Sequence, residues 1–355
     1  CCCVILNTVK QAQAVYTALK LADDEKLLFH ARFTASDRQG ITTRVLDMFG
    51  KGRWEGEGDS RVFKPAERPD KFVLVATQVV EQSLDVDFDY MISEIAPMDL
   101  LLQRSGRIKR HARRKNGKLK DTGEDERGDP LLHVLLPASE SQKSPKFGAS
   151  EIIYRRYPLL RTLESLKMSQ IRLPEEFRPL IEAVYGDLPD EAPNDLSEAR
   201  QNWDDLQEDL AAQAGEFLLC EPMLDEFDPV GADEVGDESD DGNGWRARTR
   251  LGLNDVTIIP FSAKKAETFK AGDIHPRLVK CLYKRSVKIP PHCWPPRPAK
   301  DYGQPVLGEG MLRGVWLLPV SVQNGGWAWC GVKEDGKPYE IRYNSKTGLT
   351  HGGDK

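Results

Sequence analysis

The sequence contains no run of about eighteen apolar residues, which is the length that a membrane-spanning helix needs. Its seven cysteines include no Cys-x-x-Cys pair, so their spacing favours neither a disulfide framework nor a structural zinc site. The first residues do not have the pattern of a signal peptide. Together these absences predict a cytoplasmic protein with reduced thiols and no membrane contact.

The sequence also lacks the motifs of a complete nucleotide-hydrolysis site. It has no Gly-x-x-x-x-Gly-Lys-Ser/Thr loop, because Gly50-Lys51-Gly52 has neither the spacing nor the hydroxyl that holds phosphates and magnesium. No acidic box follows a predicted strand, and none of the six histidines is followed by aspartate. We therefore predict no metal site in this chain and no turnover of ATP by it alone.

The charge distribution is uneven along the 355 residues. Residues 181–240 contain 20 acidic residues and one basic residue, Arg200, so the remainder has 49 basic against 36 acidic residues, a net charge of +13. The rest of the chain is thus basic enough to bind nucleic acid, although the whole chain carries −6. The acidic segment itself is typical of a solvated linker; a DNA mimic that covers a basic groove is the sharper alternative.

Apolar runs alternate with helical periodicity over the first 140 residues, which predicts an α/β domain with a parallel sheet covered by helices. The spacing predicts strands over 2–6, 27–29, 72–76, 90–95 and 131–136. Helices are predicted over 9–22, from an N-cap at Ser36 or Asp37 to Gly50, and over 98–108. The polar segments 51–70 and 112–129 are predicted to be loops.

The pattern changes beyond residue 140. Residues 150–185 have helical periodicity, and the acidic segment 189–241 contains a short predicted helix around Leu206 and Leu210, with Phe217 and Leu218. From Trp245 the chain is β-rich, with predicted strands over 256–261, 315–320 and 327–332. The tryptophans of this part are more typical of a core than of base stacking.

An arginine-rich segment carries the clearest chemistry. Arg104, Arg107 and Arg110 are spaced by three, so on a helical turn they share one face beside Gln103. Guanidinium groups at that spacing favour a polyphosphate, whose oxygens match their planar donors, and Gly106 allows close approach. The following basic residues are instead predicted to form a solvated or nucleic-acid-facing surface: Arg113, Arg114, Lys115, Lys118 and Lys120.

Two segments resemble motifs of superfamily 2 helicases. The stretch from Thr77 to Asp85 resembles motif V, and Gln103-x-x-Gly106-Arg107-x-x-Arg110 resembles motif VI. The wording ATQVVEQSLDVDFD, with Asn7-Thr8-Val9 and His30-Ala31-Arg32-Phe33 upstream, is similar to the CRISPR-associated helicase-nuclease of type I systems. The resemblance covers residues 1–137, is weaker at Thr249–Gly252, Arg342-Tyr343 and Gly348-Leu349, and is not seen in the acidic middle.

The resemblance implies roles for individual residues. Arg107 and Arg110 would contact ATP phosphates as the catalytic residues, with Arg110 as the arginine finger. The same edge of the nucleotide would be lined by Gln103, Arg104, Gly106, Asp85 and Ser83. Thr77, Gln78, His30, Arg32, Asn7 and Thr8 would lie along single-stranded DNA. From the residues alone, His30 and Thr77 are more typical of structural groups at strand ends.

The resemblance further implies an organisation: a second RecA-like helicase domain (1–140), a helical connector with the acidic insert (141–244) and a C-terminal accessory domain (245–355). ATP with Mg would be bound jointly with a first RecA-like domain, and divalent metals only in a nuclease domain, neither of which is in this chain. Single-stranded DNA and the CRISPR RNA-guided surveillance complex would be its partners. The alternatives are another superfamily 2 helicase acting on RNA, and a non-catalytic module that binds nucleic acid or a partner.

Overall fold

The computed structural model describes residues 1–56, 60–81, 84–120, 123–137, 145–166, 170–188, 192–215, 255–262, 276–290, 305–306, 315–323, 325–332 and 336–352. The chain divides into two compact units, one of Cys1–Gly186 with Asp255–Lys355 and the other of Asp187–Asn254. Within the described ranges, no helix combines the length and the apolar character that crossing a membrane requires.

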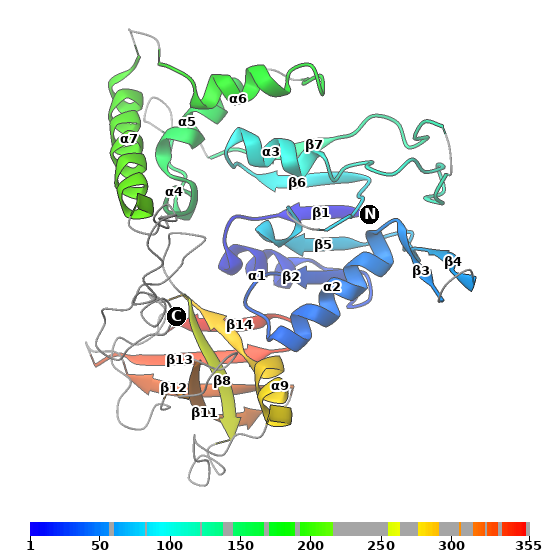
Figure 1. The fold of residues 1–355 in the computed structure, drawn as a ribbon, viewed down its shortest axis with the longest axis vertical. Helices are drawn as coiled ribbons and strands as arrows, with labels where there is room; N and C mark the ends of the chain where they lie inside the picture. Colours follow the sequence, from blue (N-terminus) through cyan, green and yellow to red (C-terminus); the bar gives the residue numbers. More distant parts are fainter. Residues whose placement is uncertain are drawn as a thin grey trace, which may run out of the picture. The chain divides into compact units, whose positions relative to one another are not determined.

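A five-stranded parallel sheet, in the order β2-β5-β1-β6-β7, lies at the start of the first unit (Figure 1). Its strands are β1 (Cys2–Ile5), β2 (Lys26–Phe29), β5 (Val73–Ala76), β6 (Tyr90–Glu94) and β7 (Leu132–Leu135). All five predicted strands are therefore confirmed, as is the predicted α/β fold with its parallel sheet. The central strand, β1, pairs with β5 on one side and β6 on the other.

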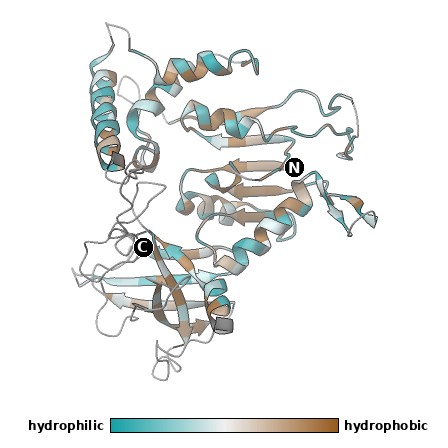
Figure 2. Ribbon diagram, in the orientation of Figure 1, coloured by the Kyte–Doolittle hydropathy of each residue, from teal (hydrophilic) through white to brown (hydrophobic). Residues whose placement is uncertain are grey.

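Helices cover both faces of this sheet. Successive residues of a strand point to opposite faces, so alternate side chains of β1 pack with different helices. Cys2 and Val4 pack with helix α1 (Val9–Ala18), whereas Cys3 and Ile5 pack with helix α2 (Ala35–Phe49). The apolar colour therefore runs along whole strands in Figure 2, as expected for a parallel sheet buried on two sides.

Helix α2 begins one turn earlier than predicted. Its N-cap is Thr34, whose hydroxyl accepts a hydrogen bond from the backbone N–H of Asp37 at 3.2 Å, so neither Ser36 nor Asp37 is the cap. Threonine satisfies a free N–H of the first turn as well as serine does. The helix ends at Gly50, as predicted.

The segment 51–70 is not only a loop. It contains the hairpin of β3 (Gly52–Glu55) and β4 (Val62–Pro65), in which Trp54 stacks edge-on against Phe63 at 5.4 Å between ring centroids. The prediction missed it because the glycines, prolines and charges of this segment hide a very short two-stranded pattern. Trp54 remains 60% exposed, so the hairpin adds little to the core.

Helices dominate the next part, as predicted for residues 150–185. The first unit continues through α4 (Ala149–Tyr154), α5 (Arg156–Ser165) and α6 (Phe177–Tyr185). In the second unit, α7 (Asn194–Gly215) contains Leu206 and Leu210 and is longer than the short helix predicted there. Phe217 and Leu218 lie outside the described residues.

The last part of the first unit is a mixed sheet in the order β14-β13-β12-β11-β8-β9, with β10 paired to β11. The three predicted strands are confirmed as β8 (Val256–Ser262), β11 (Val315–Gln323) and β12 (Gly326–Val332). Not predicted were β9 (Val287–Ile289), β10 (Pro305–Val306), β13 (Pro338–Asn344), β14 (Gly348–Gly352) and helix α9 (Pro276–Arg285). Trp327 and Trp329 lie in the core, as predicted; Trp245 and Trp294 are outside the described residues.

Candidate nucleotide and nucleic-acid sites

The parallel sheet brings the residues predicted to bind nucleic acid to one edge. Asn7 and Thr8 follow β1, His30 follows β2, and Thr77 and Gln78 follow β5. Carboxyl ends of parallel strands meet at the same edge, which is where open α/β sheets commonly bind ligands. The sheet order thus gathers segments that are up to 70 residues apart in the sequence.

A pocket of about 1060 Å³ opens beside this edge. Three of the residues predicted to bind nucleic acid line it: Asn7, Thr8 and Arg32. Helix α1 adds Lys10, which the sequence analysis missed. Further lining residues are Ile152, Ile153, Tyr339 and His351. Ile152 is 77% exposed there. A cationic wall beside apolar and aromatic side chains suits a strand of nucleic acid, whose phosphates need positive charge and whose bases need apolar surface.

Several predicted residues of this edge are structural rather than free to bind. Asn7 is buried, and its side-chain amide donates to the Ile95 carbonyl at 2.7 Å and to Ser150 Oγ at 2.9 Å. Thr77 is also buried. Thr8 caps helix α1 by accepting the N–H of Gln11 at 3.2 Å. The Asn7 amide donors therefore already have acceptors inside the protein, although the resemblance implies that this residue lies along DNA.

His30 is likewise buried, as is typical of a structural histidine at a strand end, although the resemblance implies that it lies along DNA. Its Nε2 lies 3.1 Å from the Thr347 carbonyl, and its Nδ1 accepts the N–H of Arg32 at 3.1 Å, so the neutral ring is fully hydrogen-bonded. Burial lowers the pKa of His30 to about 4. Gly348 has φ +70°, and a Cβ there would lie 2.5 Å from the His30 ring. The histidine therefore docks the β13–β14 turn.

Two segments of the resemblance flank this turn: Arg342-Tyr343 in β13 and Gly348-Leu349 in β14. The Tyr343 hydroxyl accepts the N–H of Thr34 at 3.1 Å and donates to the Asp37 carboxylate. The N–H of Leu349 donates to the Arg32 carbonyl at 2.9 Å. Arg32 Nη1 lies 3.0 Å from His351 Nε2, which fixes one wall of the pocket. These contacts tie the C-terminal sheet to the segment after β2.

A second group of charged residues, the arginine cluster, consists of Asp85, Arg107, Arg110 and His111. Helix α3 (Met98–Ser105) stops before Arg107, so Arg104, Arg107 and Arg110 do not share a helical face as predicted. Arg110 Nε donates to Asp85 Oδ1 at 2.7 Å, and His111 Nε2 lies 3.1 Å from the same oxygen without hydrogen-bond alignment. Arg110 and Asp85 are about half exposed, at 42% and 52%.

Arg107, like His111, is an incompletely satisfied member of this cluster. Its Nη2 donates to the Glu81 carbonyl at 2.8 Å, but its buried Nε–H has no acceptor among the described residues. Burial, and then the nearby charge of Arg110, lower the pKa of Arg107. An unpaired buried donor beside a second guanidinium fits an anion with several oxygens, so these residues fit the phosphates of a nucleotide. Asp85 would have to give up its hydrogen bond with Arg110 before Arg110 could bind that anion.

Arg104 does not belong to this cluster, although the resemblance implies that it lines the nucleotide site. The side chain is completely buried, and its Nη2 lies 2.5 Å from Glu81 Oε1. It also donates to Ser93 Oγ at 2.7 Å and to the Glu94 carbonyl at 3.0 Å. A guanidinium enclosed in this way has no donor left to offer a phosphate. Gln103 and Gly106 are exposed, and Ser83 lies outside the described residues.

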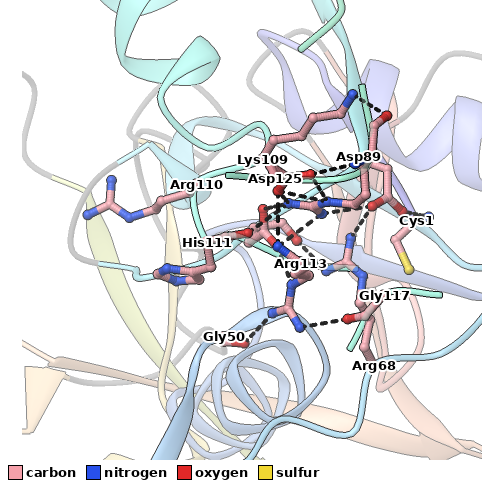
Figure 3. Close-up of polar contacts among 12 residues, drawn as sticks. Cys1, Gly50, Arg68, Asp89, Lys109, Arg110, His111, Arg113, Gly117 and Asp125 are labelled. Atoms are coloured by element: carbon pink, nitrogen blue, oxygen red, sulfur yellow. Dashed lines mark hydrogen bonds and ion pairs between the residues drawn. The ribbon is translucent and has the colours of Figure 1, made fainter. Parts of the chain in front are cut away.

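Arg113 was predicted to be on a solvated surface, and this is also wrong. Its Nε donates to Asp87 Oδ2 at 2.5 Å, its remaining donors reach Gly50 and Gly117, and it is 1% exposed. Arg68 and Arg127 complete the buried group around Asp87 (Figure 3). Arg110 and His111 point away from this group in the same view. The described residues contain no cluster of three or more side chains that could hold a metal ion.

Residues 1–113 match the family model described as "CRISPR-associated nuclease/helicase Cas3, C-terminal". The chain is 30% identical over 326 residues to the CRISPR-associated endonuclease/helicase Cas3 of Thermus thermophilus, covering 85% of this chain and 33% of that protein. It is 28% identical over 362 residues to its Escherichia coli counterpart, covering 98% and 35%. The chain therefore spans about a third of the length of these relatives. The similarity also extends through the acidic middle, where the sequence motifs showed none.

Solved structures give the same relationship. A crystal structure described as T. fusca Cas3-ATP is similar with a TM-score of 0.70 and 27% identity, covering 99% of this chain and 38% of that one. A chain of a CRISPR RNA-guided surveillance complex in a pre-nicking state is similar with a TM-score of 0.64 and 26% identity, covering 98% and 40%. The likeness therefore includes the parallel sheet, the helical part and the C-terminal sheet.

Proposed function

We propose that this chain, which is related over nearly its whole length to the C-terminal part of the CRISPR-associated Cas3 helicase-nucleases, is the second RecA-like half and accessory domain of an ATP-dependent single-stranded DNA translocase. In the intact enzyme it would feed foreign DNA to a nuclease domain during type I CRISPR interference. The observation that carries the proposal is the arginine cluster, in which Arg107 keeps an unpaired buried donor next to the half-exposed Arg110.

On the nucleotide side, the described residues of this chain that would contact phosphates are Arg107 and Arg110. A bound ATP with Mg would provide the phosphoanhydride bond whose hydrolysis drives movement. Arg110 would leave Asp85 and place its guanidinium against the γ-phosphate oxygens, where charge spreads as the bond breaks. Arg107 would hold the same phosphate through its free Nε–H while keeping its bond to the Glu81 carbonyl. The phosphate loop and the magnesium carboxylate would come from the first RecA-like domain.

On the nucleic-acid side, the pocket at the carboxyl edge of the sheet would hold the strand. Lys10 and Arg32 would contact phosphates, and the first turn of α1, capped by Thr8, would present backbone N–H groups to them. Ile152 and Ile153 would lie against the bases. None of these groups reads a base edge, which fits a motor that moves along any sequence.

Two relatives bear on partners. One similar structure is described as a CRISPR RNA-guided surveillance complex, and another as Cas3 with ATP. We therefore propose that the intact protein binds such a complex and acts in the cytoplasm, where foreign DNA is met. The alternative of a non-catalytic binding module predicts the same pocket but no use for the arginine cluster.

The test is fluorescence-anisotropy binding of this chain to single-stranded DNA and RNA over a salt series, together with ATP hydrolysis by the chain and by the intact helicase-nuclease. We expect DNA binding that weakens steeply with salt, background hydrolysis by the chain, and DNA-stimulated hydrolysis by the intact enzyme. Preference for RNA would favour the RNA-helicase alternative. Strong hydrolysis by the chain alone that Arg110→Ala abolishes would contradict the split site.

A further inference from the structure

A buried polar network joins the two candidate sites. Its centre is the Arg104 guanidinium, which donates to Glu81 Oε1 at 2.7 Å, to Tyr154 Oη at 3.1 Å and to Asn7 Oδ1 at 3.4 Å. Glu81 is 4% exposed and Arg104 is completely buried. Because separating a buried ion pair leaves an uncompensated charge in a low-dielectric interior, Glu81 and Arg104 must move together.

Each end of the network reaches one site. The Glu81 carbonyl accepts Nη2 of Arg107, so the residue that pairs with Arg104 through its side chain holds the arginine cluster through its backbone. At the other end, Asn7 directly precedes Thr8, the N-cap of the helix that lines the nucleic-acid pocket. A shift of Arg107 toward an anion is therefore linked, through Glu81, Arg104 and Asn7, to the start of α1.

Tyr154 closes the network from a different part of the chain. It is the last residue of α4, and its hydroxyl accepts from Gln78 Nε2 at 2.9 Å as well as from Arg104 Nη2 at 3.1 Å. Gln78 also donates to the Asn7 carbonyl at 2.9 Å. The two residues before Tyr154, Ile152 and Ile153, line the nucleic-acid pocket. A single hydroxyl thus connects Arg104 and Gln78 to the helix that forms a wall of that pocket.

We propose that Tyr154 is a positioning residue that couples nucleotide binding at the arginine cluster to the binding of single-stranded DNA in the pocket. The inference rests on the proposed function. When an anion draws Arg107, the Glu81–Arg104 pair moves as a unit, and the Tyr154 hydroxyl passes this movement to Gln78 and to α4. Without the hydroxyl, Arg104 and Gln78 lose their shared acceptor, and the sites remain linked only through Asn7, whose Oδ1 lies 3.4 Å from Arg104 Nη2, so the coupling weakens.

The experiment measures the affinity of the intact helicase-nuclease for single-stranded DNA with and without a non-hydrolysable ATP analogue. Energetic coupling between two sites commonly changes affinity by about 5- to 150-fold, so we expect the wild-type ratio to lie in that range. Tyr154→Phe keeps the ring and removes only the hydroxyl. We expect it to reduce that ratio by about threefold or more while the affinity without nucleotide changes less than about twofold.

Tyr185→Phe is the matched control. The Tyr185 hydroxyl donates to Asp99 Oδ1 at 2.8 Å and so joins α6 to α3 outside the network. The control should lose a similar hydrogen bond and keep the wild-type ratio. Equal ratios in wild type and Tyr154→Phe, or equal losses in both variants, would overturn the coupling role. A wild-type enzyme without any nucleotide effect on DNA affinity would instead contradict the proposed function itself. Substitutions of Arg104 or Glu81 are unsuitable here, because they threaten folding.

Discussion

The arginines of one short segment divide into two kinds. Arg104 and Arg113 are 0% and 1% exposed and have carboxylate partners within 2.5 Å, whereas Arg107 and Arg110 lie between them in the sequence and remain incompletely paired or half exposed. All four have the same side chain and nearly the same spacing. Their surroundings decide which guanidinium stabilises the fold and which is available to a ligand.

The strongest way to test this division is to remove an available arginine. Arg110→Ala should lower DNA-stimulated ATP hydrolysis of the intact enzyme by about 10³-fold or more, the range found for arginine fingers, because charge on the transferring phosphoryl group loses its partner. Steady-state hydrolysis and thermal unfolding measure the two effects separately. Stability should hardly change, since the Arg110–Asp85 pair is exposed. Arg114→Ala, at an exposed arginine nearby, should leave hydrolysis unchanged; an equal loss there would remove the distinction.

Removing an interior arginine should have the opposite consequence. Arg104→Met leaves the Glu81 carboxylate buried without its partner, so we expect the free energy of unfolding to fall by about 3–5 kcal/mol. Urea denaturation of this chain measures the loss. The control is Arg178→Ala, because Arg178 is 87% exposed and a solvent-exposed pair such as Arg178–Glu182 contributes little to stability. Similar urea midpoints for Arg104→Met and Arg178→Ala would show that burial does not separate structural arginines from exposed ones.

The comparison extends to His30. The resemblance implies a contact with nucleic acid, the residues alone indicate a structural group at a strand end, and the structure buries the side chain. Burial holds its pKa at about 4 instead of 6.5, so between these values the unfolded chain binds a proton that the folded chain does not. Stability should therefore fall as the pH drops from 6.5 towards 4, by roughly 3 kcal/mol in all at about 1.4 kcal/mol per pH unit.

Unfolding curves over this pH range check the effect, and His30→Asn should flatten the dependence. His133 is exposed on β7, so His133→Asn should keep the wild-type dependence. If His30→Asn and His133→Asn reduce the pH dependence of stability equally, that dependence comes from groups other than His30.

The smallest expected effect concerns the pocket. Lys10→Ala should weaken binding of single-stranded DNA severalfold and reduce the slope of log affinity against log salt by about 0.7, the value for one phosphate contact on a single strand. Lys20 is exposed farther along the chain after α1 and does not line the pocket, so Lys20→Ala should keep more of the slope. If the salt-dependence slopes of Lys10→Ala and Lys20→Ala are identical, the DNA does not bind in this pocket.

Local patterns were sufficient for much of the fold. Alternating apolar runs located all five strands of the parallel sheet, because a strand buried on both faces is continuously apolar. The β3–β4 hairpin was missed because its two strands are short and mostly exposed. Strand β13 was missed because its buried Tyr339, Ile341 and Tyr343 alternate with polar residues and form no continuous apolar run. Motif wording located the residues of the arginine cluster and of the sheet edge, which lie within residues 1–113, the range that the family model matches.

The sequence by itself determined the α/β fold, the strands whose ends meet at the pocket, and the presence of arginines suited to phosphate. Only the tertiary structure decided that Arg104 pairs with Glu81, that His30 contacts the turn before Gly348, and that one Arg107 donor has no acceptor among the described residues. Periodicity reports which face of an element is apolar. It does not report which distant carboxylate or carbonyl meets a given polar side chain, because those partners are 23 to 317 residues away and are brought together by packing alone.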